Sequence, residues 1–333
     1  MPVIRRSRWT KRESRSGRVL QFGRLFTRRS PLIPDKLGYF NDYRLGVVKD
    51  GTIVDVTDLV GDIPRVGPGD LMSRLIESFD AYRPKLTEAA ASRPGIPLES
   101  VRLRAPLPKP GKIVCMVQNY LEDGALEKPN PFNAFLKSPA AVIGDGDTVI
   151  LTEEPATIFH HEAECAAIIG KRAQNISEAE AGDIIFGYTN FCDVSARNLG
   201  PAGADVFFLV KSPHTFAPMG PYITTKDEIP NHQDLRMRLT VDGALRQNYS
   251  TSDMGYTIEQ TLAWISTIVT LNPGDIVSLG TNHQGLGPLQ DGERVELGAE
   301  GLGTLHFNVS DRLKRTWPVG IDQAMADRQA RRT

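Results

Sequence analysis

Hydrophobic and polar positions alternate in short blocks along most of the chain, a pattern that predicts many strands and few helices. Two glutamates, Glu162 and Glu164, lead into an apolar run that ends at Gly170, as expected for a strand that enters a core. Asp50-Gly51 separates two β-rich runs and predicts a hairpin within residues 40–60. Further strands are predicted at 113–117, 141–143, 148–151, 162–169, 184–190, 235–241, 276–279 and 305–309.

Helical spacing of apolar residues is confined to a few segments. Residues 258–269 place Ile258, Leu262 and Ile265 on one face, and Pro273-Gly274 follows as a stop signal. Shorter helices are predicted at 69–82, 84–92 and 177–181.

Prolines at 106, 108 and 110 mark a linker and place a domain boundary near residue 110. We therefore expect a basic N-terminal arm at 1–30, a small α+β domain at 31–110, a catalytic domain at 111–320 and a C-terminal tail at 321–333.

Composition supports a globular, β-rich α+β protein. The chain has 333 residues, 40% of them hydrophobic, and its 30 Gly and 23 Pro favour turn-rich over all-helical architecture. No apolar run approaches the roughly 18 residues of a membrane span, and no secretory segment is recognisable. Three cysteines, an odd number, indicate buried thiols in a reducing compartment. We expect a cytoplasmic protein without a membrane partner.

The net charge of −1 hides a strong asymmetry. Residues 1–30 contain ten Arg or Lys and one Glu, a net of +9, so residues 31–333 carry −10. The arm superficially resembles an organellar transit peptide, and a nucleic-acid-binding tail is an alternative. Because apolar residues recur through it, we expect it instead to dock on the acidic remainder or on a partner subunit, with no nucleic-acid partner.

The glutamate pair carries the first chemical signal. Glu162 and Glu164 are two positions apart and so point to the same side of a strand. Two acids at the edge of a core are well matched to a hard divalent cation, with Asp193 as a third oxygen ligand. The alternative is a solvated acidic strand edge, the usual place for a lone pair of this kind.

Nine motifs in order connect this pair to a known family. They are Lys112–Tyr120, Phe135–Pro139, Glu162–Lys171, Phe186–Thr189, Asp193–Arg197, Lys211-Ser212, Pro218–Pro221, Leu271–Asp275 and Gly280-Thr281. In these motifs, over about 200 residues, the chain resembles the fumarylacetoacetate hydrolase family.

The resemblance implies a mixed β-sandwich roll around Mg²⁺, or Mn²⁺ or Ca²⁺, in a homodimer. It also implies a small-molecule oxo-acid substrate, such as an acylpyruvate, and a metal site of Glu162, Glu164 and Asp193. Lys211 takes the place of the family's cation beside the metal and is assigned to the substrate oxyanion. Tyr120 and Thr281 fall at substrate-binding positions. For Arg197 two roles stay open: binding of the substrate carboxylate, or holding Asp193 in place.

The sequence departs from the family in the loop after Tyr120. Relatives carry a His and then a Glu there, at positions that are Asp123 and Leu126 in this chain. Among the nearby acids, Glu127 is a candidate for the missing Glu, and Glu122 for a further metal ligand or catalytic acid. His283 is a candidate acid or base near the site; its alternative is a turn residue that bonds the backbone.

Three functions follow from these residues. The first is metal-dependent hydrolysis of a carbon–carbon bond in a 1,3-diketo or 2-oxo acid. The second is decarboxylation, isomerisation or hydration of a 2-oxo acid, which needs no His-activated water. The third is a non-catalytic family member whose basic arm engages a partner.

Overall fold

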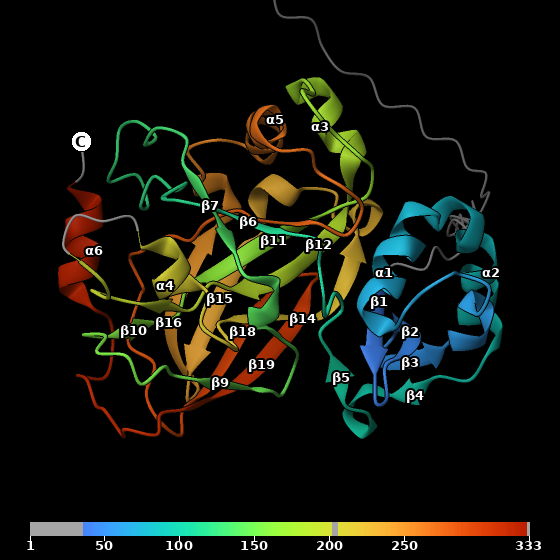
Figure 1. The fold of residues 1–333 in the computed structure, drawn as a ribbon, viewed down its shortest axis with the longest axis horizontal. Coiled ribbons are helices and arrows are strands. Elements are labelled where there is room, and N and C mark those ends of the chain that lie inside the picture. Colours follow the sequence, from blue (N-terminus) through green and yellow to red (C-terminus); the bar gives the residue numbers. More distant parts are fainter. Residues whose placement is uncertain (1–35, 202–205, 332–333) are drawn as a thin grey trace, which may run out of the picture. The chain divides into compact units, whose positions relative to one another are not determined.

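Two consecutive apolar strands, β11 (Ala163–Ile169) and β12 (Ile185–Cys192), form the centre of the structure, a computed structural model that describes residues 36–201 and 206–331 (Figure 1). They pair antiparallel, with Ala163 opposite Cys192. Every residue of both strands is buried, which explains why neither strand alternates between apolar and polar residues. Both strands are present where the sequence predicts them.

β11 and β12 belong to a 12-stranded sheet built from both halves of the chain. Its other strands are β1 (Lys36–Phe40), β2 (Arg44–Lys49), β3 (Thr52–Asp55), β4 (Ile96–Pro97), β5 (Leu103–Arg104), β6 (Ile113–Met116), β7 (Ala134–Lys137), β8 (Val142–Ile143), β14 (Ala217–Thr225) and β17 (Ile276–Ser278). The order is β4-β3-β2-β1-β14-β12-β11-β17-β6-β7, with β5 beside β1 and β8 beside β14. Because β1 pairs with β14, the boundary predicted near residue 110 falls within one continuous sheet, and the division into domains stays a prediction.

A second sheet packs against the first. It consists of β9 (Thr148–Ile150), β15 (Arg236–Val241), β16 (Ala244–Ser250), β18 (Arg294–Ala299) and β19 (Gly303–Ser310), in the order β16-β15-β18-β19-β9. The sheets meet where β19 packs on β14 and β18 on β12, and the larger apolar core lies between them. Parallel pairs such as β17–β6 and β19–β9 occur among antiparallel ones. The predicted strand-rich, mixed α+β fold is confirmed.

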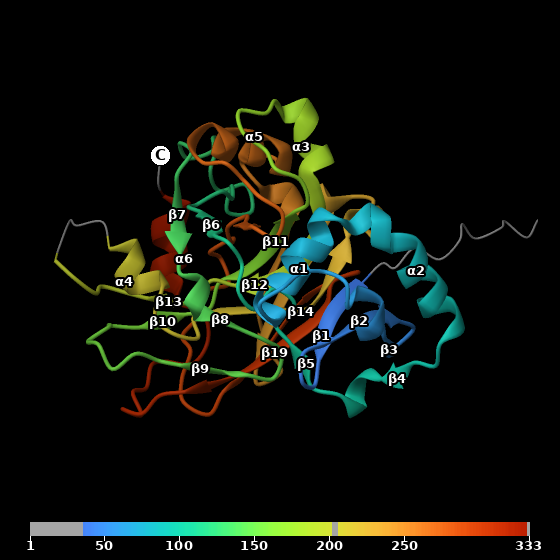
Figure 2. The same ribbon diagram turned by 45° about the vertical axis from the view of Figure 1, so that its right-hand side comes forward.

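Helices cover the sheets (Figures 1 and 2). They are α1 (Pro68–Glu77), α2 (Phe79–Ser92), α3 (Glu178–Ile184), α4 (Phe207–Lys211), α5 (Ile258–Ile268) and α6 (Gln323–Ala330). α5 begins where the sequence predicts, because the Thr257 hydroxyl accepts a hydrogen bond from the Gln260 N–H. In the part of the chain that the structure describes, no helix combines the length and apolar character needed to cross a membrane.

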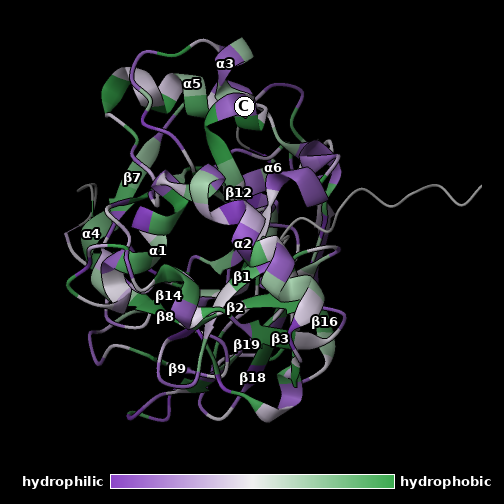
Figure 3. Cartoon of the chain, turned by 90° about the vertical axis from the view of Figure 1, so that its right-hand side faces the viewer, coloured by the Kyte–Doolittle hydropathy of each residue, from purple (hydrophilic) through white to green (hydrophobic). Residues whose placement is uncertain are grey.

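The N-terminal helices differ from the prediction at their junction. The break falls at Ser78, not before Pro84, which lies inside α2. The Ser78 N–H still bonds to the Arg74 carbonyl, and α2 then starts with Phe79, whose ring packs edge-on against Phe186. The first residue of α2 is thus anchored in the core by its buried ring. Figure 3 shows hydrophilic and hydrophobic residues along α2, as expected for a helix with only one buried side.

The remaining expectations concern the cysteines and the ends of the chain. Cys115, Cys165 and Cys192 are buried and unpaired, as predicted. The basic arm at 1–30 lies outside the described residues, so its docking stays a prediction. Within the predicted tail at 321–333 the structure has α6, in which Met325 and Ala326 are buried.

Candidate active site

Three buried carboxylates meet at the paired ends of β11 and β12. Glu162 and Glu164 flank the first residue of β11, and Asp193 directly follows β12. The backbone N–H of Asp193 donates to the Glu162 carbonyl, 3.0 Å away. This bond holds the start of β11 and the end of β12 side by side. One oxygen of each acid lies within 4.8 Å of the others. The structure thus brings together the three predicted metal ligands.

Two buried lysines reach into this acidic cluster. Lys211, at the end of α4, places Nζ 2.6 Å from Glu162 Oε2 and 2.7 Å from Asp193 Oδ2. Lys137, at the end of β7, places Nζ 2.5 Å from Asp193 Oδ1. Lys137 was not among the predicted site residues. A sequence signal for it exists, because Lys137 follows two apolar residues in the run Phe-Leu-Lys. A lysine in such a setting indicates burial, and a fully buried lysine needs a charged partner.

Arg197 completes the cationic side of the site. Its guanidinium forms an ion pair with Glu162, not with Asp193 as one of its two predicted roles required. Its Nε also donates to Nδ1 of His160 over 3.0 Å. Arg197 therefore orients Glu162 directly and still borders the cavity described below.

The two glutamates of the pair differ in electrostatic environment. Burial raises the pKa of Glu162, but the charges of Lys211 and Arg197 outweigh it and hold that pKa below its usual range. Burial, with the charges of Asp193 and Glu162, raises the pKa of Glu164 well above its usual range. Glu164 accepts hydrogen bonds from the Ser278 hydroxyl and the Gly280 N–H. Among the described residues, no cation pairs with it.

This donor set fits a divalent metal ion. Oxygen atoms of carboxylates are the ligands that hard cations such as Mg²⁺, Mn²⁺ and Ca²⁺ prefer. A buried carboxylate without a cationic partner, as found at Glu164, is costly unless a positive charge or a proton is supplied. The cluster is therefore a candidate metal centre, with Glu162, Glu164 and Asp193 as the residues that would hold the ion.

A histidine and a glutamate form a second buried pair at the same site. Nδ1 of His283 lies 2.6 Å from Glu122 Oε1, and the other oxygen of Glu122 accepts from the His283 backbone N–H at 2.8 Å. Gln284 Nε2 adds a hydrogen bond of 3.0 Å to Glu122. Glu122 thus orients His283 and is not part of the three-carboxylate cluster. Glu122 has a positive φ of 58°, a backbone conformation that is uncommon for residues other than glycine.

One cavity of about 420 Å³ connects these groups. Of the predicted site residues, Glu162, Glu164, Arg197, Lys211, Thr281 and His283 line it. Other lining groups were not predicted as site residues. They are side chains of α6, Gln118, and the stacked rings of Phe135 and Phe207, whose centroids lie 4.7 Å apart.

Two other predicted residues, Glu127 and Tyr120, do not line the cavity. Glu127 is exposed and is not among the lining residues. Tyr120 is buried edge-on against Tyr249, with no hydrogen-bond partner for its hydroxyl among the described residues. Thr281 lines the cavity, yet its hydroxyl donates to the Ala163 carbonyl at 2.8 Å and accepts from Gln247. The roles assigned to Glu127 and Tyr120 stay predictions.

Gln247 connects the strand that carries the predicted metal ligands to the turn that carries His283. Its side-chain oxygen accepts from the Ala163 N–H at 2.9 Å and lies 3.0 Å from His161 Nδ1. Its amide nitrogen donates to Thr281 and to the Asn282 carbonyl. In the sequence Gln247 stands between Arg246 and Asn248, in a polar stretch that gives no sign of a buried residue.

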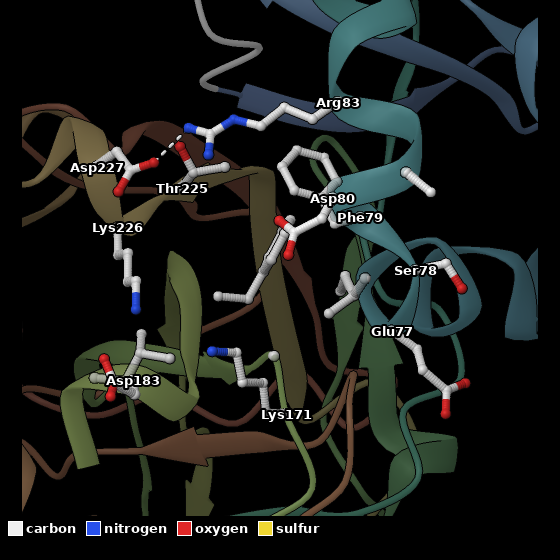
Figure 4. A pocket seen from close by; sticks show the side chains of 15 residues that line it. Glu77, Ser78, Phe79, Asp80, Arg83, Lys171, Asp183, Thr225, Lys226 and Asp227 are labelled. Carbon is white, nitrogen blue, oxygen red and sulfur yellow. Dashed lines mark hydrogen bonds and ion pairs between the residues drawn. The ribbon is translucent and has the colours of Figure 1, made fainter. Parts of the chain in front are cut away.

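A second cavity, of about 410 Å³, lies between the α1–α2 junction and the ends of β12 and β14 (Figure 4). Three of its charged residues are engaged with protein atoms: Arg83 pairs with Asp227 at 2.5 Å, and Lys226 Nζ donates to the Gly182 carbonyl at 2.7 Å. Within the described residues, the cluster of three potential metal ligands lies at the first cavity and not at this one.

Comparisons with known proteins agree with this geometry. The family profile "Fumarylacetoacetate (FAA) hydrolase C-terminal" matches residues 112–310. A maleylpyruvate hydrolase of Aquipseudomonas alcaligenes is 32% identical over 288 residues, covering 81% of this chain and 97% of its own. The oxaloacetate tautomerase YisK of Bacillus subtilis is 36% identical over 260 residues, covering 72% and 85%.

A solved structure of a maleylpyruvate hydrolase is also similar to this chain. The maleylpyruvate hydrolase of Sphingobium sp. SYK-6, in complex with manganese(II) and pyruvate, superposes with a TM-score of 0.75 at 35% identity, covering 83% of this chain and 99% of that one. The relatives named here are enzymes, and the profile covers more than half of the sequence. The chain is an enzyme of the fumarylacetoacetate hydrolase family.

Proposed function

We propose that this protein is a divalent-metal-dependent hydrolase that cleaves a carbon–carbon bond in an acylpyruvate-like 1,3-diketo or 2-oxo acid. The observation that carries the proposal is a single cavity lined by Glu162, Glu164 and His283, with His283 paired to Glu122. A site for a Lewis-acidic cation and a base beside it are the two parts that this reaction needs. The manganese and pyruvate in the Sphingobium enzyme support this reading of the cluster.

A divalent cation held by the three carboxylates would act as a Lewis acid toward the carboxylate and keto oxygens of a 2-oxo acid. The charges of the site fit such a ligand. Glu162, Glu164 and Asp193 face an equal number of cations, Lys137, Lys211 and Arg197. A bound dication adds two positive charges, which match the carboxylate of a 2-oxo acid and the negative charge that develops on its keto oxygen.

His283 is the candidate base. The Glu122 carboxylate accepts at Nδ1, so Nδ1 carries the proton of the neutral ring and Nε2 is the accepting nitrogen. His283 would take a proton from water as the water oxygen bonds to the acyl carbon. The carbon–carbon bond then breaks, its electron pair passes to the 2-oxo acid fragment, and His283 returns the proton to that carbon. The products are a carboxylic acid and pyruvate or a homologue of it.

Lys211 would stabilise the charge that forms in this step. Its Nζ already lies within hydrogen-bond distance of two metal-ligating acids and lines the cavity. Burial lowers the pKa of Lys211, but the carboxylates of Asp193 and Glu162 raise it above its ordinary value. The residue therefore stays charged and donates to the substrate oxyanion.

A second candidate function uses the same base without water. His283 would remove a proton from the carbon next to the keto group and return it elsewhere, which is tautomerisation or isomerisation. Two observations favour it: the loop after Tyr120 lacks the family's histidine, and the Bacillus subtilis relative is named as an oxaloacetate tautomerase. Decarboxylation and hydration are further variants of this second function.

Activity with defined substrates separates the two candidates. Protein stripped of metal by a chelator is given Mg²⁺ or Mn²⁺, and acylpyruvate cleavage is followed through loss of the diketone absorbance. Cleavage supports hydrolysis, whereas interconversion of the keto and enol forms of oxaloacetate without acyl cleavage supports tautomerisation. Carbon dioxide release from oxaloacetate identifies a decarboxylase. Failure to bind any divalent ion overturns both functions.

Other expectations also stay predictions. They are magnesium as the natural ion, a homodimer, a cytoplasmic location and the absence of a nucleic-acid partner.

A further inference from the structure

The C-terminal helix α6 forms part of the active-site cavity. Met325, Arg328 and Gln329 line it together with the metal-ligating glutamates. α4, which carries Lys211, and α6 lie near each other on one side of the molecule in Figures 1 and 2. A substrate whose 2-oxo acid group is bound at Glu162 and Glu164 would therefore extend toward side chains of α6.

Three contacts hold α6 in this place. Asp322, whose side chain accepts from the Met325 N–H at the start of the helix, lies 3.0 Å from His160 Nε2. Because Arg197 donates to the other nitrogen of His160, the proton of that neutral ring lies on Nε2 and is donated to Asp322. Gln118 Nε2 donates to Gln329 at 2.8 Å.

The third contact comes from the turn that carries His283. Gln284 Nε2 donates to Glu122 and, at 3.4 Å, to the Ala326 carbonyl of α6. Both chemical groups of the active site, the carboxylate cluster and the histidine pair, are thus tied to one helix.

Arg328 differs from the other cations of the cavity. Arg197 and Lys211 are paired with acids. Arg328 is exposed, and its guanidinium contacts the sulfur of Met325 at 2.9 Å. Among the described residues, no carboxylate forms an ion pair with it. A cation that borders a substrate cavity and has no acidic partner is suited to an anionic part of the substrate.

We propose that Arg328 binds a second carboxylate of the substrate, at the end remote from the 2-oxo acid group, and so makes the enzyme prefer dicarboxylic substrates. This inference rests on the proposed function, which supplies the position of the 2-oxo acid group. A single unpaired guanidinium matches one negative charge and the planar geometry of a carboxylate. A phosphate would bring close to two negative charges and need further donors.

Ligand binding to the full-length, Mn²⁺-loaded protein tests the inference. The probes are 2-oxoglutarate and 2-oxopentanoate, which differ only in that a methyl group replaces the distal carboxylate; 2-oxoadipate and 2-oxohexanoate repeat the comparison one carbon longer. Isothermal calorimetry gives each affinity. For at least one pair the wild type should bind the dicarboxylate at least about tenfold more tightly, as expected for a charge-assisted hydrogen bond.

Variants on α6 assign this preference. Arg328→Gln should weaken dicarboxylate binding about tenfold or more and change monocarboxylate binding less than about twofold. Arg328→Lys, which keeps the charge but not the planar fork, should retain an intermediate preference. The matched control is Arg331→Gln, since Arg331 pairs with Asp327 and does not line the cavity; it should behave as wild type.

The outcomes are distinguishable. If the wild type binds Mn²⁺ and 2-oxo acids but Arg328→Gln changes neither affinity, or lowers both alike, the role of Arg328 is overturned and the proposed function stands. If the wild type does not bind Mn²⁺, the proposed function itself is overturned.

Discussion

Nδ1 of His283 lies 2.6 Å from a carboxylate oxygen of Glu122, although 160 residues separate them in the chain. Glu122 belongs to the loop from which the family's histidine is missing, and His283 belongs to a turn after β17. The structure thus places a histidine from another part of the sequence in the same cavity as Glu162 and Glu164, the predicted metal ligands. The relationship leads directly to the first prediction.

Replacing His283 with Gln should lower kcat by about a hundredfold or more, the usual contribution of a general base. Mn²⁺ affinity should stay near the wild-type value, because His283 is not one of the three clustered ligands. His306→Gln is the matched control, since His306 pairs with Asp145 and does not line the cavity. Steady-state kinetics and metal titration check both variants; an unchanged kcat in His283→Gln would exclude it as the base.

Replacing Glu164 with Gln should weaken Mn²⁺ binding by at least about a hundredfold, since loss even of a group that supports a ligand costs 10–100-fold. Activity should be lost with it. The metal-free variant should unfold at the same temperature as wild type or higher at neutral pH, because the change removes a buried acid that folding must either protonate or leave ionised without a cationic partner. The exposed Glu153→Gln serves as control. Wild-type Mn²⁺ affinity in Glu164→Gln would contradict the assigned metal site.

Metal binding should release a proton. The pKa of Glu164 is raised above its ordinary value of 4.5 in the folded, metal-free protein. Between pH 4.5 and this raised pKa, the folded state therefore holds a proton on Glu164 that the unfolded state has lost. The stabilisation linked to this proton is full below about pH 4.5 and is lost as pH rises through the raised pKa. A bound cation displaces the proton.

Calorimetric titration with Mn²⁺ in buffers of different ionisation enthalpy measures this release. The observed binding enthalpy should depend on the buffer, and the affinity should increase with pH. Identical enthalpies in all buffers would show that Glu164 is already ionised before the metal binds.

Replacing Lys137 with Met should destabilise the metal-free protein by about 3 kcal/mol, because it breaks a buried ion pair and leaves the Asp193 carboxylate with fewer cationic partners. Mn²⁺ should recover part of this loss, since a bound cation again compensates Asp193. Chemical denaturation with and without Mn²⁺ provides the measurement. Lys128→Met, at an exposed lysine with no ion pair among the described residues, should cost little. Equal losses with and without Mn²⁺ would argue against a cation at Asp193.

Replacing Asp322 with Ala should loosen α6. The change removes the side-chain cap at the helix start and the partner of His160; loss of such a cap alone costs about 1 kcal/mol. Hydrogen exchange of residues 323–330 should accelerate relative to wild type and to the control Asp327→Ala, an acid further along α6 whose partners are Gln323 and Arg331. Unchanged exchange would show that this anchor does not hold the helix.

Local sequence determined the elements whose signals are short-range. The apolar run of β11, the Asp50-Gly51 turn and the spacing and Thr257 cap of α5 each specify their own structure. β14 is not among the strands predicted from the sequence, and it contains Pro218 and Pro221, which are residues that disfavour a central strand. β14 accommodates these prolines in two ways. β1 pairs with Ile223 and Thr224, which lie beyond both prolines. Where the pairing of β12 with β14 is irregular, the side chains of Thr189 and Asn190 donate to the carbonyls of Tyr222 and Gly220.

For the site, the sequence by itself determined the glutamate pair, because a period of two in one strand places Glu162 and Glu164 on the same side. Only the tertiary structure decided that Lys137 joins Lys211 as a cationic partner of Asp193, and that Glu122 is the partner of His283. Lys137, His283 and Arg328 come from elements far apart in the chain. Their meeting depends on strand order and helix docking, which are set by burial of apolar surface over the whole fold and leave no spacing in the sequence to read.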